Sequence, residues 1–336
     1  MSSRGRDGAG YAAAILLMIL ILLLSILLSV SNGVAGGSIE TLLNVLINFD
    51  NLSAIGDVML EMRMPRALAA CFTGAAFAVA GAVMQGVTKN PLADAGLLGI
   101  NAGAGFMVAL SAVFFDSLPA LGTMLFAFLG AVLAVLMVYG LGAERHKSKP
   151  IRLILAGSAV SALLTALSQG ITLTFGLSKS LSFFTAGSLS GITWRQLALI
   201  LPWITAAIFV SLLLSRQLSV LALGEESASG LGLNIGAVRT VGIIAVLIMA
   251  GASVSLVGGI SFLGLIVPHS ARLLTGPDYR RVLPVSALLG AILLVLADIA
   301  ARSVNAPYDT PVGALVSAIG VPVFMTLTYR KKGELL

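Results

Sequence analysis

Long apolar stretches recur along the whole of this sequence. Ten runs are bounded by charged residues, proline or glycine, at residues 11–31, 64–86, 95–115, 118–141, 152–176, 195–214, 238–258, 261–274, 282–304 and 311–329. An α-helix needs about 20 apolar residues to cross a lipid bilayer. Only 10% of the residues are charged, against roughly 25% in a soluble domain. We therefore expect an all-α polytopic membrane protein, with one transmembrane domain over residues 1–336 and about ten spans.

Two of these runs differ from an ordinary span. The first follows Arg4 and Arg6 and is longer than the apolar part of a secretory signal peptide, so we expect a retained helix. The eighth is short, and Pro268 inside it predicts a kink or a partial crossing. The single cysteine, Cys71, lies in an apolar run, which excludes a disulfide within the chain.

The basic residues are distributed unevenly between the two sides that ten spans create. An even number of spans puts both termini on one side, and five of the twenty basic residues fall on the other: Arg63, Arg66, Lys179, Arg195 and Arg302. Because Lys and Arg are enriched in cytoplasmic loops, we expect both termini in the cytoplasm and the protein in the cytoplasmic (plasma) membrane. The net charge of +6 then reflects membrane topology and not nucleic-acid binding.

Two arginines stand at the outer entrance of the second span. Arg63 and Arg66 are three residues apart and can share a helical face, and Pro65 between them is tolerated in a first helical turn. One explanation is interfacial anchoring, because arginines at a helix end reach the lipid headgroups. The other is a docking site for acidic groups of an external partner, which the scarcity of outward arginines favours.

A polar segment, residues 216–237, is the longest inner connection. Its glycines predict two short helices with a turn near Gly230 to Gly232. The segment is either a solvated loop or a coupling element that lodges in a groove of a cytoplasmic ATPase. The contacting residues would be Leu223, Gly224, Glu225, Glu226, Ser227, Ala228, Gly230, Leu231 and Gly232. The chain has no Walker-type phosphate loop, so an ATPase would be another chain.

Few ionisable residues lie inside the spans. Asp298 and Arg302 are spaced i,i+4 near the outer end of the ninth span, which predicts a structural ion pair. A proton relay is the rival explanation, but relays usually need several such groups. His269 has only His146 as a companion, so we expect no histidine-based metal site. No G-x-S-x-G or H-E-x-x-H motif occurs, and we expect a transport subunit without catalytic residues or a cofactor of its own.

A set of ordered motifs resembles a known family. Five runs occur in order from Arg63 to the C-terminus: RMPR, GAVMQGVTKNPLADAGLLGINAGAG, LGEESASGLGL, GGISFLGLIVPHSARLLTGPDYR and ADIAARSVNAPYDTPVGALVSAIGVPVF. They closely resemble the membrane permeases of bacterial ABC importers for ferric siderophores, haem and vitamin B12, the FecCD-type or type II permeases. The family usually reads NPLADP where Ala95 follows Asp94 here, a change that would relax the start of the third helix.

The resemblance implies a ten-helix subunit that works with a second permease, two ATPase chains and an extracytoplasmic binding protein. By motif, Arg63, Arg66 and Arg302 would receive acidic residues of the binding protein, and residues 221–233 would contact the ATPase. ATP would be used by the ATPase chains. Siderophore systems often pair two different permeases, so the resemblance favours a paralogue over an identical copy.

The cargo implied by the resemblance is an iron chelate, with a ferric siderophore ahead of haem and cobalamin. The alternative is an ion- or proton-coupled secondary transporter, which predicts buried carboxylates and broken helices near the midplane. Asp298 alone gives that alternative thin support. A structural membrane protein would leave the outer arginines and the segment around Glu225 and Glu226 without partners.

Overall fold

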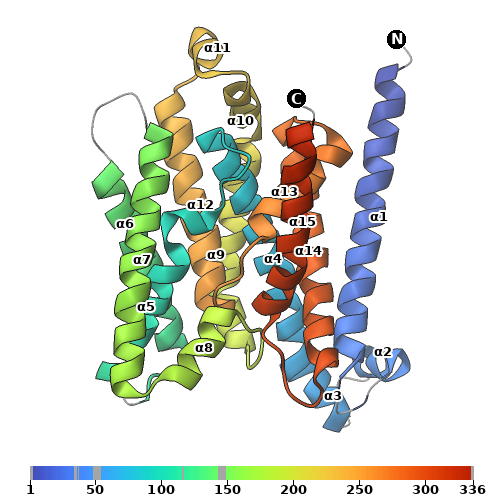
Figure 1. Cartoon of the computed structure of the whole chain (residues 1–336). Coiled ribbons are helices and arrows are strands. Elements are labelled where there is room, and N and C mark those ends of the chain that lie inside the picture. Colours follow the sequence, from blue (N-terminus) through green and yellow to red (C-terminus); the bar gives the residue numbers. More distant parts are fainter. Residues whose placement is uncertain are drawn as a thin grey trace.

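The computed structural model describes residues 3–33, 36, 38–47, 54–115, 117–142 and 149–333. Every regular element in these ranges is a helix, and the long helices run roughly along one axis (Figure 1). This confirms the all-α fold. One helix coincides with each predicted span: α1 (Ser3–Ser31), α4 (Met64–Thr88), α5 (Ile100–Phe114), α6 (Ala120–Gly142), α7 (Lys149–Phe175), α9 (Trp194–Leu213), α12 (Ile235–Val257), α13 (Leu263–Thr275), α14 (Tyr279–Val304) and α15 (Val312–Gly333).

Not all ten helices have the length of a full span. Within the described ranges, seven are long and apolar enough to cross a membrane, and α5 and α15 contribute shorter apolar stretches. α13 has only 13 residues and contains Pro268; the kink or partial crossing of this segment stays a prediction. α5 begins at Ile100, five residues later than predicted. The reason is a 3₁₀ turn, η2 (Ala95–Leu98), which ends at Gly99 with φ of 73°.

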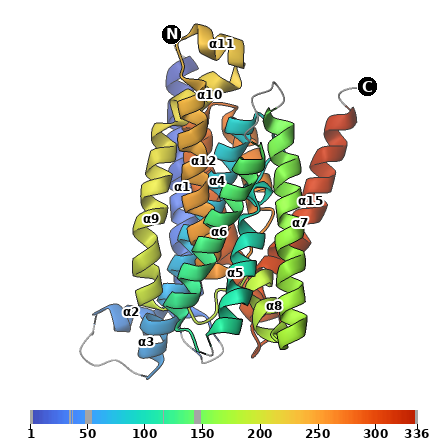
Figure 2. The same cartoon turned by 90° about the vertical axis from the view of Figure 1, so that its left-hand side faces the viewer.

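Shorter helices lie at the two ends of the bundle (Figures 1 and 2). α10 (Ser215–Ala222) and α11 (Glu225–Gly230) lie at the end where both termini emerge, which we call the terminal end. α2 (Ile39–Ile47), α3 (Ala54–Val58), the π-helical turn η1 (Met59–Arg63) and α8 (Ser178–Ala186) lie toward the opposite, far end. Of the basic residues that set the predicted orientation, Arg145 and Lys147 lie outside the described residues.

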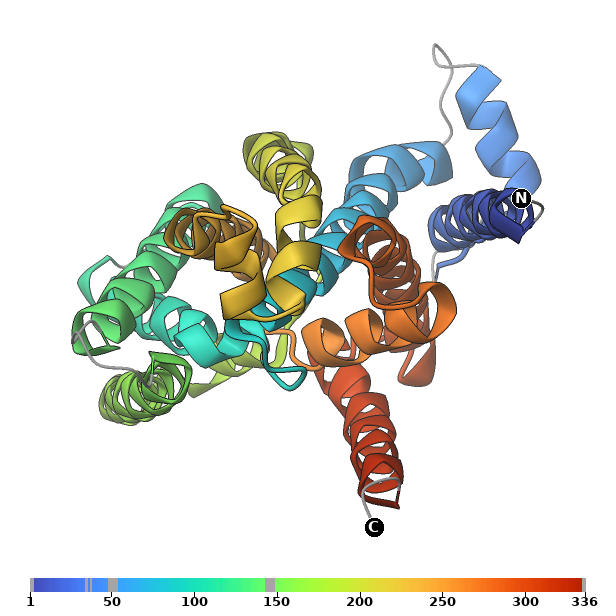
Figure 3. The same cartoon turned by 90° about the horizontal axis from the view of Figure 1, so that it is seen from above.

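The centre of the bundle is α4, which packs against α9, α12, α13 and α14 (Figure 3). Small residues allow this packing. Gly74 on α4 and Gly290 on α14 cross so closely that a Cβ on either would meet the carbonyl oxygen of the other. In lipid, such close backbone approach replaces the hydrophobic driving force that holds soluble helices together. Glycine at this crossing therefore sets the α4–α14 distance.

The peripheral helices present apolar side chains outward. α1 and α7 are mostly unburied along their lengths, and α15 leans away from the body of the bundle (Figure 3). Leu163 on α7 is 50% exposed and Ile319 on α15 is 60% exposed. Apolar faces of this kind suit contact with lipid or with another membrane chain.

Candidate functional site

Arg63 lies at the far end, where its guanidinium closes the end of α1. Its Nη1 donates to the carbonyls of Val30 at 3.2 Å and Ser31 at 3.1 Å, and its Nη2 donates to the carbonyl of Gly36 at 2.7 Å. The last carbonyls of a helix have no partners within it, and a cation there also complements the helix dipole. With only 6% of its surface exposed, Arg63 fixes the end of α1 to the start of α4.

Arg66 faces α14 and the loop that follows it. Its Nε donates to Oδ1 of Asp298 at 2.9 Å, and its Nη1 and Nη2 donate to the two carboxylate oxygens of Asp309 at 3.0 and 3.3 Å. Burial opposes ionisation of Asp309, but the hydrogen bond and the charge of Arg66 outweigh it and hold the pKa of that carboxyl below its usual value. Arg66 therefore joins carboxylates from two separate segments.

Asp298 is shared between two arginines. Its side chain has no exposed surface, and it lies 3.1 Å from Arg302 as well as 2.9 Å from Arg66. The predicted i,i+4 pair with Arg302 is thus present. Arg302 also donates to the carbonyl and the hydroxyl of Ser29 at 3.1 and 2.6 Å. We call Arg63, Arg66, Arg302, Asp298 and Asp309 the far-end cluster; it ties α1 and α4 to α14 and the loop after it.

The far-end cluster differs from the sequence expectation in two ways. Arg63 and Arg66 do not share a face, because Arg63 ends the π-helical turn η1 and turns to α1 while Arg66 turns to α14. The guanidiniums of Arg66 and Arg302 are also engaged within the chain, with side chains only 12% and 13% exposed. Docking of a partner by these three arginines stays a prediction. A cavity of about 610 Å³ opens beside Asp309.

Asp309 was not predicted as a site residue from the sequence. Its partner Arg66 is 243 residues away, and such a pairing has no local spacing that a sequence pattern can show. The only available signal was its place in the run NAPYDTP, between two apolar spans.

At the terminal end, α10 lies beside the ends of the long helices and α11 projects above them (Figure 1). The predicted pair of short helices is present, but the turn between them lies at Leu223 and Gly224 instead of Gly230 to Gly232. Gly224 has φ of 124°, and Gly232, with φ of 79°, follows the second helix. Both angles lie in the region that glycine adopts without a steric penalty.

The α10–α11 segment is held to the bundle by buried side chains and exposes two leucines. Leu218, Leu221 and Ala228 are fully buried, whereas Leu223 and Leu231 are 70% and 69% exposed. These two leucines flank the six-residue helix α11. Because they lie in a loop outside the apolar spans, lipid does not explain them, and they suit contact with another protein.

The two neighbouring glutamates of this segment have different surroundings. Glu225 accepts a hydrogen bond from Nη2 of Arg239 at 2.6 Å and lies 3.9 Å from Nζ of Lys89. Glu226 is exposed and has no ion-pair partner among the described residues. Glu225 therefore braces the segment against α12 and the end of α4, while Glu226 remains available to a partner.

Buried polar contacts join α4 to α13 near the terminal end. Gln85 donates to the carbonyl of Gly264 at 2.9 Å and accepts from Arg272. In the adjoining loop, burial raises the pKa of Asp94, although the backbone N–H groups of Ala95 and Gly96 partly offset this. No group of three His, Cys, Asp or Glu side chains that could hold a metal ion occurs among the described residues.

A bundle of helices, seven of them of membrane-spanning length in the described ranges, with a charged cluster at one end and a pair of short helices at the other, is the architecture of a polytopic membrane permease. Residues 20–330 match the FecCD transport family. The chain belongs to this family, and it is a permease of the ABC-importer class.

Individual relatives span most of the chain. It is 42% identical to the iron(3+)-hydroxamate import system permease protein FhuB of Bacillus subtilis, over 89% of this chain and 78% of that protein. It is 40% identical to the ferric enterobactin transport system permease protein FepD of Escherichia coli, over 83% of this chain and 84% of that protein. Its fold is similar to a solved metal-chelate type ABC transporter in an inward-facing conformation, with a TM-score of 0.84, 27% identity, and 95% and 99% coverage of the two chains.

Proposed function

We propose that this chain is the membrane subunit through which an ATP-driven importer takes up an iron chelate delivered by an extracytoplasmic binding protein. A ferric siderophore leads as the cargo, ahead of haem and cobalamin. The observation that carries the proposal is similarity to named iron-import permeases over more than four fifths of the chain. A proton-coupled secondary transporter is less well supported, because Asp298 is already neutralised by two arginines.

The partners follow from the two ends of the bundle. The terminal end faces the cytoplasm, because fifteen of the twenty basic residues of the sequence fall there in the ten-span topology. Two ATPase chains, which use the ATP, contact the α10–α11 segment. A second permease packs on the exposed faces of α7 and α15, where Leu163 and Ile319 project. A paralogue is favoured, since two different Bacillus subtilis permeases are both named for iron(3+)-hydroxamate import.

Docking of the binding protein rests on the charges of the far-end cluster. Arg66 and Arg302 pair with the two carboxylates of the cluster. Arg63 adds a third positive charge through a guanidinium that is bound to backbone carbonyls, so the cluster carries one net positive charge that would attract an acidic partner. Asp309 is the accessible carboxylate, with a side chain 32% exposed. An acidic group of the binding protein would therefore compete with Asp309 for the fork of Arg66.

Asp309→Asn tests this docking site by a substitution that should increase the affinity for the binding protein. Removing the competing carboxylate should tighten the binding protein by about fivefold, the value of one partly exposed ion pair. Asp57→Asn makes the same change in charge on α3 at the same end and controls for long-range attraction. The measurement is Kd for the binding protein on the complete importer in nanodiscs. Unchanged or weaker binding relative to the control would reject Arg66 as a docking residue.

The coupling role of α10–α11 has its own test. Leu223→Ser with Leu231→Ser should release the ATPase during purification, or leave ATP hydrolysis running without uptake of ⁵⁵Fe-labelled chelate. Leu141→Ser, at the terminal end of α6 and 65% exposed, is the matched control and should keep both activities. Glu226→Lys should likewise release the ATPase or leave ATP hydrolysis running without uptake. Intact ATPase binding and uptake in both variants would exclude this segment as the coupling element.

A further inference from the structure

An apolar groove of about 290 Å³ lies between four helices: α1, α4, α9 and α14. In the view from above, these helices lie on the side of the bundle away from α7 and α15 (Figure 3). From Thr73 to Thr88 every residue of α4 is buried, whereas Cys71 and Phe72 are partly exposed and line the groove. The groove is therefore a place where the central helix reaches the apolar surface of the bundle.

The lining of the groove offers almost nothing to a polar ligand. Thr205 carries the one hydroxyl among the described residues that line it, and that hydroxyl donates to the carbonyl of Leu201 at 2.8 Å. The other lining side chains are hydrocarbon, apart from the thiol of Cys71. Because van der Waals packing decides association within lipid, a flexible hydrocarbon chain is the ligand that such a surface can hold.

Helix geometry gives the depth of the groove along the bundle. Ala287, Leu288 and Ala291 of α14 line it. Arg281, in the first turn of α14 at the terminal end, precedes Ala291 by ten residues, a rise of about 15 Å. The hydrocarbon layer of one leaflet is half of about 30 Å. An acyl chain that begins at the level of Arg281 would therefore extend into the groove.

Arg281 also lies on the groove side of its helix. It precedes Leu288 by seven residues, about two turns of α14, so the two side chains share a face. On α1, Tyr11 precedes the groove residue Leu22 by eleven residues, about three turns. The guanidinium of Arg281 lies 5.4 Å from the centre of the Tyr11 ring. The two faces thus meet at the terminal end of the groove, where a cation marks its mouth.

Two further arginines lie at this end of the bundle. Arg280 adjoins Arg281, and Arg216 is in the first turn of α10, which is joined to the start of α14 by a 2.8 Å hydrogen bond from Ser219 to Asp278. Arg216 and Arg280 are exposed and have no ion-pair partner in the described part of the chain. Asp278 supplies one negative charge against the three positive charges. These side chains therefore leave two net positive charges above an apolar groove.

We propose that the groove binds an anionic phospholipid of the leaflet at the terminal end. One acyl chain lies between α1 and α9, and the phosphate lies near Arg216, Arg280 and Arg281. An anionic headgroup complements these arginines, whereas the ammonium of a zwitterionic headgroup cancels the charge of its phosphate. The site uses no residue of the far-end cluster and does not depend on the cargo of the importer.

Photocrosslinking of the complete importer in phosphatidylcholine nanodiscs tests the proposal. A trace of phosphatidylglycerol or of phosphatidylcholine carries a diazirine in its acyl chain, and cross-linked peptides are quantified by mass spectrometry. In wild type, peptides with residues 71–75 and 205–212 should be labelled about 25-fold more by the phosphatidylglycerol probe, since each net positive charge near an anionic lipid is worth about fivefold. Arg280→Gln should lower this preference to about fivefold. Ala287→Phe should fill the groove, and labelling by both probes should be lost.

Two control variants make the same changes outside the groove. Arg195→Gln removes an exposed arginine at the start of α9, and Ala206→Phe adds the same ring on α9 at an exposed residue that does not line the groove. Both should be labelled as wild type, and size-exclusion chromatography shows that each variant assembles.

Three outcomes would overturn the proposal. Equal labelling by the two probes in wild type, or an unchanged preference in Arg280→Gln, would exclude an anionic headgroup at these arginines. Groove labelling that persists in Ala287→Phe would show that the acyl chain lies elsewhere. Absence of labelling in the assembled wild type would show that another membrane chain covers the groove.

Discussion

Removing the charge of Asp298 tests how the far-end cluster is held together. The side chain is fully buried between Arg66, at 2.9 Å, and Arg302, at 3.1 Å. Asp298→Asn keeps its shape and removes its charge. Arg66 would retain Asp309, but Arg302 would lose the only carboxylate it pairs with in the described part of the chain and keep its bonds to Ser29.

The structure sets the expected magnitude. Removing one partner of a buried ion pair costs about 3–5 kcal/mol. One guanidinium is left unpaired instead of two, and Arg302 keeps 13% exposure, so we expect about 3 kcal/mol, the low end of that range. Asp309→Asn removes a carboxylate that is 32% exposed and should cost about 1 kcal/mol at most. Two chemically identical substitutions in one cluster should thus differ about threefold.

Cys71 provides the assay. It is the only cysteine of the chain and lies within α4, so unfolding exposes it to a thiol-reactive dye. Titration with SDS in mixed micelles, followed by Cys71 labelling, gives the free energy of unfolding of each variant. Adding Arg302→Leu to Asp298→Asn removes the unpaired charge and should recover at least about 1 kcal/mol. Additive losses of stability for Asp298→Asn and Arg302→Leu would show that the two side chains do not stabilise the fold as a pair. A smaller loss for Asp298→Asn than for Asp309→Asn would likewise contradict the role given to the buried carboxylate.

Three further outcomes are expected. Gly290→Ala should destabilise the fold by about 1–3 kcal/mol in the same titration, because the new Cβ meets the backbone of Gly74. Gly140→Ala is the control and should not destabilise the fold, because its Cβ meets nothing within 4 Å. Asp278→Ala should lower the free energy of unfolding by about 1 kcal/mol, because Asp278 is the N-cap of α14 and accepts from the N–H of Arg280 at 3.0 Å. Asp278→Asn keeps an acceptor oxygen and should therefore keep most of this stabilisation. The lowered pKa of Asp309 means that its stabilisation is present above pH of about 4 and is lost on further acidification, so wild type and Asp309→Asn should converge in acid.

The sequence by itself determined the order and approximate bounds of the ten helices that coincide with the predicted spans. Apolar length and the breaks between runs are local properties, and lipid leaves helices as the natural way to satisfy the backbone of each run. The i,i+4 pair of Asp298 and Arg302 was predictable for the same reason, since helix geometry alone brings the two side chains together. The ordered motifs from Arg63 onward similarly indicated the family to which the chain belongs.

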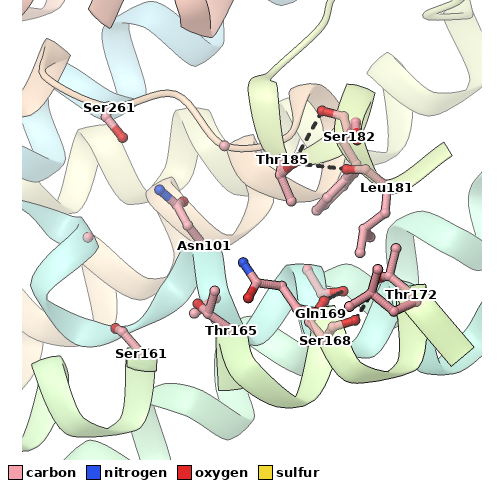
Figure 4. A pocket seen from close by; sticks show the side chains of 16 residues that line it. Asn101, Ser161, Thr165, Ser168, Gln169, Thr172, Leu181, Ser182, Thr185 and Ser261 are labelled. Carbon is pink, nitrogen blue, oxygen red and sulfur yellow. Dashed lines mark hydrogen bonds between the residues drawn. The ribbon is translucent and has the colours of Figure 1, made fainter. Parts of the chain in front are cut away.

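Only the tertiary structure decided which distant groups meet. Arg66 reaches Asp309 across 243 residues, and Gly74 meets Gly290 across the α4–α14 crossing. Ser161, Thr165 and Gln169 of α7 line a cavity of about 700 Å³ (Figure 4). Nothing in the sequence indicated this, because a polar residue in an apolar run faces a cavity only when other helices enclose the space in front of it. Local spacing fixes the helices. The contacts between them, which create the far-end cluster, depend on packing that no single segment encodes.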